Sequence, residues 1–189
     1  MTSKSFHILL CCTGSVACLK IPLLIPALKE KFAGCGIKVV LTENSEHFLN
    51  LEELSKEATI IKDKEEWNVW KKPGDRVLHI DLCNWADLVL FAPLDANTLA
   101  KLANGLCDNL VSCIARAWDF NARPVVFCPS MNTQMWLHPV TAPQVETLKK
   151  WGCKFVSPVV KVLACGAEGI GAMAEIEEIV EAVSQNAPK

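Results

Sequence analysis

FHILLCCTGSVACLK, residues 6–20, contains the combination on which the fold depends: an apolar run, a Gly-Ser turn and a segment with helical character. The run from Phe6 to Cys12 has no Asp, Glu, Lys or Arg, which is typical of a strand buried on both faces of a sheet. The run is too short to span a membrane, and a buried first strand is favoured over a secretory signal peptide. We therefore expect a central strand that leads into a turn.

Further apolar runs follow along the chain and alternate with segments of helical spacing. The expected strands are residues 6–12, 37–42, 87–93, 124–129 and 153–158, and the expected helical segments are about 15–32, 96–118 (a double stretch), 139–151 and 175–185. This alternation predicts an α/β fold with a central parallel sheet and helices on both faces, a three-layer arrangement of the Rossmann or flavodoxin type. Pro22 and Pro26 should kink or interrupt the first helical segment.

Length and composition indicate one domain, residues 1–189. The chain is 51% hydrophobic and 21% charged, which fits a globular core, and its net charge of −2 gives no footprint for nucleic acid or an anionic membrane. Its 10 cysteines form no C-x-x-C pair, so most are expected to be buried free thiols of a reducing, cytoplasmic protein. The spacing of Cys and His predicts no metal site.

The loops after the strands are the expected binding edge, because ligands of open parallel sheets lie beyond the carboxyl ends of the strands. They are residues 13–17, 42–48, 93–98 and 129–136. Gly14 and Ser15 could hold an anionic group such as a phosphate, or Ser15 could simply cap a helix. In PLDANT, Asp95 and Thr98 allow the same two interpretations.

The stretch PSMNTQMWLHP, residues 129–139, also allows two interpretations. In one, a turn leads into a short amphipathic helix whose Met135 and Trp136 fill gaps in the core. In the other, Asn132 lies in a ligand-facing turn as a buried amide that must find a polar partner.

Two candidates for chemistry remain. His79, in RVLHIDLCNW, lies just upstream of a strand and is either a surface histidine or a catalytic one. Residues 161–175, KVLACGAEGIGAMAE, have the glycine content of a mobile loop. That loop is either a lid on which Cys165 supplies a proton, or an ordinary flexible segment with an incidental thiol.

Taken together, these stretches resemble the cysteine decarboxylase (HFCD) flavoproteins over nearly the whole chain. PSMNTQMW matches the family's Pro-x-Met-Asn-x-x-Met-Trp signature and PLDANT its Pro-Leu-x-Ala-Asn-Thr signature, although Ser130 stands where alanine is more common. The resemblance implies bound FMN. The matching cofactor positions are Gly14, Ser15, Val16, Thr42, Phe48, Asp95, Ala96, Asn97, Thr98 and Ser130.

The resemblance also implies a reaction, with 4'-phospho-N-pantothenoylcysteine as the favoured substrate and 4'-phosphopantetheine of coenzyme A biosynthesis as the product. Oxidation of the thiol to a thioaldehyde creates an electron sink, CO2 leaves, and the enethiol is reduced. His79 would act as base or orient the substrate, Cys165 would donate the proton, and Asn132 would hold the carboxylate. Further implied substrate contacts are Met135, Ala164 and Gly166, with a flap at about residues 161–174 and a homotrimer that holds flavin between subunits.

Three alternatives keep the fold and change the function. One is decarboxylation of a peptide's C-terminal cysteine, and a second is a regulatory subunit of a protein phosphatase, whose known examples carry long acidic extensions that this sequence does not show. The third is a flavin prenyltransferase, which the Met-Asn-x-x-Met-Trp stretch fits poorly. No basic cluster in the sequence identifies the residues that would bind the substrate phosphate.

Overall fold

The computed structural model describes residues 5–162, 166 and 168–187, and its centre is a six-stranded parallel sheet of order β3-β2-β1-β4-β5-β6. A separate antiparallel hairpin, β7-β8, follows it in the chain. The strands are β1 His7–Cys12, β2 Gly36–Leu41, β3 Thr59–Lys62, β4 Leu88–Leu94, β5 Val125–Pro129, β6 Lys154–Phe155, β7 Val159–Val162 and β8 Glu168–Ala172.

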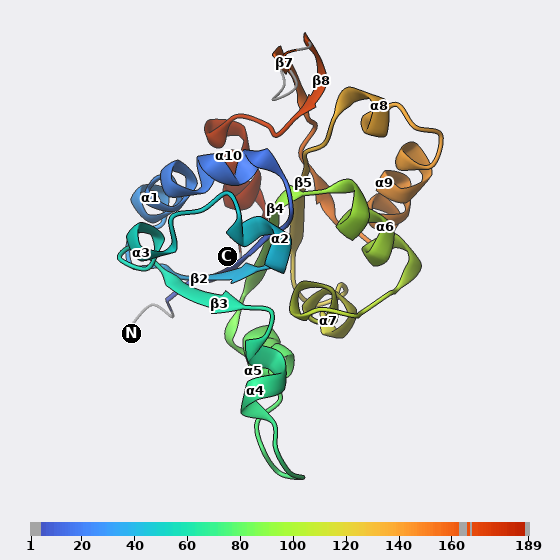
Figure 1. The fold of residues 1–189 in the computed structure, drawn as a ribbon. Helices are drawn as coiled ribbons and strands as arrows, with labels where there is room; N and C mark the ends of the chain where they lie inside the picture. Colours follow the sequence, from blue (N-terminus) through green and yellow to red (C-terminus); the bar gives the residue numbers. More distant parts are fainter. Residues whose placement is uncertain (1–4, 163–165, 167, 188–189) are drawn as a thin grey trace.

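Helices cover both faces of this sheet, as predicted, with α1 and α10 on one face and α5, α6, α7 and α9 toward the other (Figure 1). The helical elements are the 3-10 helix η1 Val16–Lys20, then α1 Ile21–Lys31, α2 Glu43–Glu46, α3 Leu51–Leu54, α4 Glu65–Val69, α5 Leu78–Trp85, α6 Ala96–Asn104, α7 Leu110–Ala117, α8 Thr133–Trp136, α9 Thr141–Lys150 and α10 Ile176–Asn186.

The side chains of β1 show how the layers are held together. Ile8 and Leu10 point into the core shared with α1 and α10, whereas Leu9 and Cys11 point into the core shared with α5, α6 and α7. All four side chains are completely buried. The alternation is the two-residue period of a strand, and burial on both faces explains the continuous apolar run in the sequence.

The order of strands reverses beside β1, since β2 pairs with one edge of β1 and β4 with the other. The loops after β1 and β4 therefore separate at the carboxyl edge of the sheet, which is the usual binding position in doubly wound folds. The strands predicted at residues 37–42, 87–93, 124–129 and 153–158 are confirmed as β2, β4, β5 and β6, with bounds that differ by at most a few residues.

Several elements were not predicted. The short strand β3 was not predicted because its sequence, TIIK, is a run of only four residues. His79 lies upstream of β4, as expected, but the helix α5 that carries it in its first turn was not among the expected helical segments. The predicted mobile loop at residues 161–175 is also wrong in part, because its described residues include β8 and the end of β7.

The two prolines of the first helical segment are accommodated differently. The segment is interrupted, as expected, where η1 passes into α1 at Ile21. Pro22 falls in the first turn of α1, where its missing N–H removes no hydrogen bond. Pro26 lies inside α1, which continues to Lys31.

The cysteines within the described residues are free, and six of those nine are buried. In the same part of the chain, no group of three or more His, Cys, Asp or Glu side chains could hold a metal ion. None of the described helices is long and apolar enough to cross a membrane.

Candidate functional site

A cavity of about 680 Å³ lies at the carboxyl edge of the sheet and extends to the β7-β8 hairpin. Its size is within the range of roughly 300–1,000 Å³ common for ligand sites. Of the residues predicted for the site, nine line it: Gly14, Ser15, Val16, Asp95, Ala96, Asn97, Ser130, Asn132 and Met135. The loops after β1, β4 and β5 therefore converge on one space, as the sequence predicted.

Thr13 ties two of these loops together. Its Oγ1 donates to the Pro93 carbonyl at 2.9 Å and accepts from the Asp95 amide at 2.7 Å, and the whole residue is buried. This hydroxyl fixes the end of β1 against the end of β4. Next to it, a Cβ on Gly14 would lie only 2.8 Å from the Cβ of Asn44, so the close approach of the short helix α2 requires glycine.

Ser15 and Ser130 connect the loops after β1 and β5. The Ser15 Oγ donates to the Ser130 Oγ at 3.0 Å and accepts weakly from the Ala17 amide at 3.3 Å. Ser15 therefore caps η1, which is one of the two roles that the sequence suggested. It also lines the cavity, so it is placed where the other suggested role, contact with an anionic ligand, would require it. Alanine at position 130 would remove this bond between loops.

Asp95 likewise has both features that the sequence suggested. Its Oδ1 accepts from the Thr98 amide at 2.6 Å and caps α6, while the residue lines the cavity.

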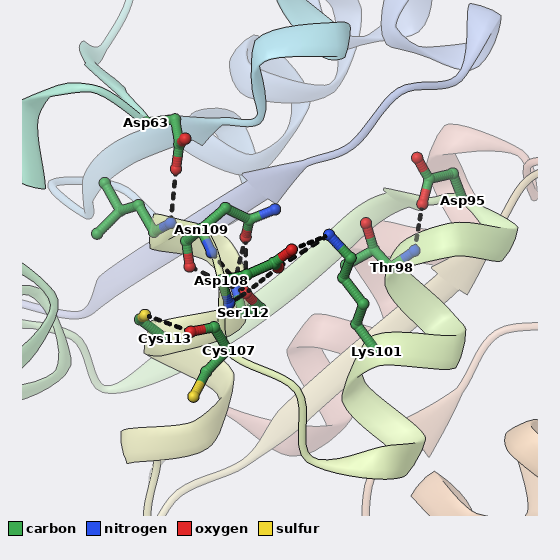
Figure 2. A network of polar contacts seen from close by, with 10 residues as sticks. Asp63, Asp95, Thr98, Lys101, Cys107, Asp108, Asn109, Ser112 and Cys113 are labelled. Carbon is green, nitrogen blue, oxygen red and sulfur yellow. Dashed lines mark hydrogen bonds and ion pairs between the residues drawn. The ribbon is translucent and has the colours of Figure 1, made fainter.

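The far end of α6 is fixed as well, because Lys101 Nζ lies 2.8 Å from both Asp108 carboxylate oxygens (Figure 2). Asn109 and Ser112 form a capping box at the start of α7 in the same network. The helix that starts at the cavity is therefore held at both ends.

Asn132 does not fit either of its two interpretations completely. The residue is exposed rather than buried, and its Oδ1 accepts from the Gln134 amide at 2.9 Å, so it caps the short helix α8. Met135 does not fill the core, since 51% of it is exposed and it lines the cavity. Trp136 is half-buried and stacks on Phe155 with ring centroids 6.4 Å apart.

The β7-β8 hairpin closes one side of the cavity by packing on the loop after β5. The Met131 amide donates to the Gly171 carbonyl at 2.9 Å. A Cβ on Gly171 would collide with the Met131 carbonyl oxygen, and a Cβ on Gly169 would collide with the Thr133 Oγ1. These glycines are therefore needed for close packing, and not for the mobility that the sequence suggested.

A charged cluster lies at the same side of the cavity. Lys20 Nζ is 3.4 Å from one carboxylate oxygen of Glu175, and Lys161 forms a close ion pair with the other. The hydrogen bond from Lys161, together with the charge of Lys20, lowers the pKa of the Glu175 carboxyl. The cluster joins η1, β7 and the start of α10.

His79 is not among the described residues that line this cavity. Its Nδ1 lies 2.6 Å from Glu66 Oε1, and its amide donates to the other carboxylate oxygen at 3.1 Å. Helices α4 and α5 project at the opposite end of the molecule from the hairpin (Figure 1). A single copy of the chain therefore does not bring His79 to the hairpin.

Other predicted residues also lie elsewhere. Thr42, Phe48, Thr98 and Gly166 are absent from the described lining, and Ala164 and Cys165 fall outside the described residues. Thr42 is buried directly after β2, Thr98 is buried in the first turn of α6, and Phe48 packs against the core that α1 shares. Among the described residues, two buried side-chain polar atoms have no hydrogen-bond partner, and the Thr42 Oγ1 is one of them.

Sequence reasoning missed several residues of the site. Asn44 lies in the segment that follows β2, so the rule that placed the other loops could have found it. Lys20 is the last residue of η1 and lies beyond the loop to which that rule applies. Lys161 and Gly171 could not be found that way, because the hairpin that carries them was not predicted. Thr13 gave no signal beyond its position after an apolar run.

Comparison with known proteins agrees with this geometry. A family model described as flavoprotein matches residues 1–187. The chain is 51% identical over 180 residues to a mouse protein named phosphopantothenoylcysteine decarboxylase, covering 95% of this chain and 86% of that one. It is 46% identical to a rice protein of the same name, covering 89% and 75%.

Two solved structures share the fold. One is a cysteine-to-serine variant of PPC decarboxylase complexed with pantothenoylaminoethenethiol, with a TM-score of 0.91 and 43% identity over 96% of this chain and 98% of that one. The other is the FMN binding protein AtHal3, with a TM-score of 0.86 and 43% identity over 96% of each chain. With its match to the family model over residues 1–187, the chain belongs to the flavoprotein family.

Proposed function

We propose that this chain is a phosphopantothenoylcysteine decarboxylase that uses FMN. The observation that carries the proposal is the convergence of the two signature loops, PLDANT and PSMNTQMW, on one cavity. Relatives that match nearly the whole chain at 45–51% identity bear this name, which supports the same substrate here.

The residues around the cavity fit FMN. The turn at Gly14 leaves no room for a side chain, so backbone there can approach a ligand closely. Ser15, Ser130 and Asn97 offer hydroxyl and amide groups, and the buried Oγ1 of Thr42 has no hydrogen-bond partner among the described residues. Such a donor set suits a phosphate and a polar heterocycle. We propose that the cofactor is held by Gly14, Ser15, Val16, Asp95, Ala96, Asn97 and Ser130, which line the cavity. Thr42, Phe48 and Thr98, which the described lining does not include, stay predicted contacts from the resemblance alone.

When bound, FMN supplies a two-electron acceptor and donor, which allows the substrate thiol to be oxidised before CO2 leaves and the enethiol to be reduced afterwards. The chain's own part begins with the carboxylate. Asn132 stands at the cavity with Met135, and a side-chain amide can orient a carboxylate without neutralising it as a cation would. The loss of CO2 is favoured when the carboxylate keeps its charge in an apolar setting.

Proton transfer requires two further groups. We assign the base, or the group that orients the thiol, to His79, whose ring is held by Glu66 at 2.6 Å. Cys165 is the proposed donor to the enethiolate, with Ala164 and Gly166 beside it in the flap at about residues 161–174. The backbone contact between Met131 and Gly171 and the pairing of β7 with β8 support this proposal, because they hold the described part of the hairpin against the loop that carries Asn132.

A homotrimer would complete the site, because His79 does not line the cavity of its own copy in the described chain. The projecting segment from α4 to α5 exposes Trp67 by 74% together with Trp70, Val77 and Ile80. The cavity rim exposes Leu19, Met135 and Val162. Contact between these two apolar surfaces would bury both and carry His79 of one copy to the cavity of another. The free thiols suit a reducing compartment such as the cytoplasm.

The experiment is a comparison of substrates and variants on the purified FMN-loaded protein. We expect CO2 release from phosphopantothenoylcysteine and none from a peptide that ends in cysteine. Asn132→Ala and His79→Ala should lose CO2 release, whereas Cys165→Ser should stop at the enethiol. A protein that binds no FMN, or that decarboxylates only the peptide, would refute the proposal.

A further inference from the structure

We propose that Glu66 is a positioning residue for His79: its carboxylate fixes the tautomer of the ring that carries the proton on Nδ1, and so leaves Nε2 free to take a proton. The inference rests on the proposed function, in which His79 acts as base or orients the substrate thiol. It assigns a role to a carboxylate that the sequence pattern does not single out.

Two hydrogen bonds join Glu66 to His79. The Glu66 Oε1 lies 2.6 Å from the ring Nδ1, and its Oε2 accepts from the His79 amide at 3.1 Å. Only 10% of the Glu66 side chain is exposed, and no Lys or Arg in the described part of the chain forms an ion pair with it. Both oxygens of this carboxylate are therefore engaged by one residue.

The fold explains why both bonds form. Glu66 lies in α4 and His79 in the first turn of α5, and these two short helices lie against each other in the projecting segment (Figure 1). The residue before α5, Val77, makes no side-chain cap. Amides in the first turn of a helix have no partner within the helix, so the carboxylate from α4 supplies one. The bond to the amide holds one oxygen of Glu66, which places the other at the ring.

This contact decides where the ring carries its proton. A carboxylate can only accept a hydrogen bond, so Nδ1 must be the donor. In the neutral ring, Nε2 then has a free lone pair, and no hydrogen bond among the described residues uses it. The His79 side chain is 24% exposed, which leaves the ring open to contact from another copy of the chain.

The tautomer determines which way a proton can move. The thiol proton passes from the substrate sulfur to Nε2, and the S–H electron pair stays on the sulfur as a thiolate. The ring becomes an imidazolium, and its positive charge faces the Glu66 carboxylate, which stabilises it. The opposite tautomer already carries a proton on Nε2 and offers no lone pair there to the thiol.

Glu66→Gln tests the tautomer without removing the acceptor for the helix. The His79 amide can only donate, so it holds the oxygen of the new side chain, and the NH2 group is then directed at Nδ1. Nδ1 must accept from that group, which moves the ring proton to Nε2. We expect kcat for CO2 release from phosphopantothenoylcysteine to fall by roughly a hundredfold or more, with KM changed by no more than about twofold. FMN binding and assembly should be retained.

The tautomer is measured independently of activity, by nitrogen NMR of protein labelled at its histidine rings. The chain has four histidines, and His79→Ala identifies the signals of His79. The wild type should carry the proton on Nδ1, and Glu66→Gln should carry it on Nε2. Glu66→Asp keeps a carboxylate, so it should keep the wild-type tautomer and a kcat above that of Glu66→Gln.

Glu65→Gln is the matched control. Glu65 is the neighbouring residue of α4, and its Oε1 also accepts from a backbone amide, that of Lys62 at 2.8 Å. The substitution removes the same charge from the same helix and leaves the contact with His79 in place. Its kcat, its KM and its histidine signals should equal those of the wild type.

Several results would overturn the inference. A wild-type ring with its proton on Nε2 would exclude the proposed tautomer, and a wild-type kcat in Glu66→Gln would show that the tautomer does not matter for the reaction. Loss of FMN or of assembly in Glu66→Gln, or equal kcat values in the Gln and Asp variants, would assign Glu66 to the structure of the projecting segment instead. A wild type that releases no CO2 would overturn the proposed function, and with it the role of Glu66, whichever tautomer the NMR spectrum shows.

Discussion

Gly171 and Met131 lie in backbone contact: the Met131 amide donates to the Gly171 carbonyl at 2.9 Å, and no Cβ fits at Gly171 beneath the Met131 carbonyl. Gly171 also has φ +137°, which an L side chain rarely adopts. Through this contact, the hairpin that bounds the cavity and carries Lys161 is joined to the loop that carries Asn132. The shape of the cavity depends on the pair.

The first prediction concerns this contact. Gly171→Ala should raise KM for the substrate and lower the free energy of unfolding by about 1–3 kcal/mol, because it introduces both a collision and an unfavourable φ. The control is Gly152→Ala, since Gly152 has φ +87° and nothing within 4 Å of the built Cβ. It should show the backbone strain alone, with an unchanged KM. Equal KM values for the two variants would contradict the proposed role of the hairpin.

The second prediction concerns the buried hydroxyl of Thr13. Thr13→Val keeps the shape but leaves the Asp95 amide without its partner and removes one of the two hydrogen bonds to the Pro93 carbonyl, so urea unfolding should show a loss of about 1–3 kcal/mol. Thr147→Val provides the comparison. Its hydroxyl donates to the Pro143 carbonyl at 2.9 Å in an exposed position on α9, where water can replace it. If the two losses are the same, Thr13 does not have the stabilising role inferred here.

The third prediction is a loss of stability at alkaline pH. Burial raises the pKa of the Cys128 thiol well above its ordinary value of 9.0. Above pH 9 the unfolded chain therefore releases a proton that the folded chain retains, and stability falls as pH rises, by about 1.4 kcal/mol per pH unit for each such thiol. Below pH 9 this effect is absent.

Urea unfolding of the wild type and of Cys128→Val between pH 8 and pH 10 measures this effect. The slope with pH should be smaller in the variant, whatever its stability at pH 8. An identical slope would show that Cys128 ionises as readily in the folded chain as in the unfolded one.

The fourth prediction concerns assembly. If His79 of one copy serves the cavity of another, co-expressed His79→Ala and Asn132→Ala chains should regain activity, because random mixing restores both residues in about a quarter of the sites. Each variant alone should be inactive. Mixed assemblies, isolated through two different tags, provide the measurement. No recovery in mixed trimers would place His79 and Asn132 in the same copy's site.

The sequence was sufficient to predict the sheet and the loops of the site because these depend on local patterns. Uncharged runs predict buried strands, and the position of a loop after a parallel strand places it at the binding edge. The same rule predicted that the loops of Gly14, Asp95 and Asn132 lie at one binding edge, and the structure shows that all three residues line one cavity.

The remaining features depend on contacts between distant segments. Gly169 and Gly171 looked like loop glycines, since nothing local shows that the backbone of residues 131–133 packs against them. Likewise the pairing of His79 with Glu66, and of Lys20 and Lys161 with Glu175, joins separate elements. A spacing rule cannot predict such pairs.

The most direct test of the central claim is a single turnover without oxygen. FMN-loaded protein is mixed with less than one equivalent of phosphopantothenoylcysteine in the absence of any external oxidant or reductant, and CO2, product mass and the flavin spectrum are followed. Our account predicts one CO2 per substrate, a product lighter by the mass of CO2 alone, and a final flavin spectrum that is again oxidised. No CO2, or a product that also lacks two hydrogens, would contradict it.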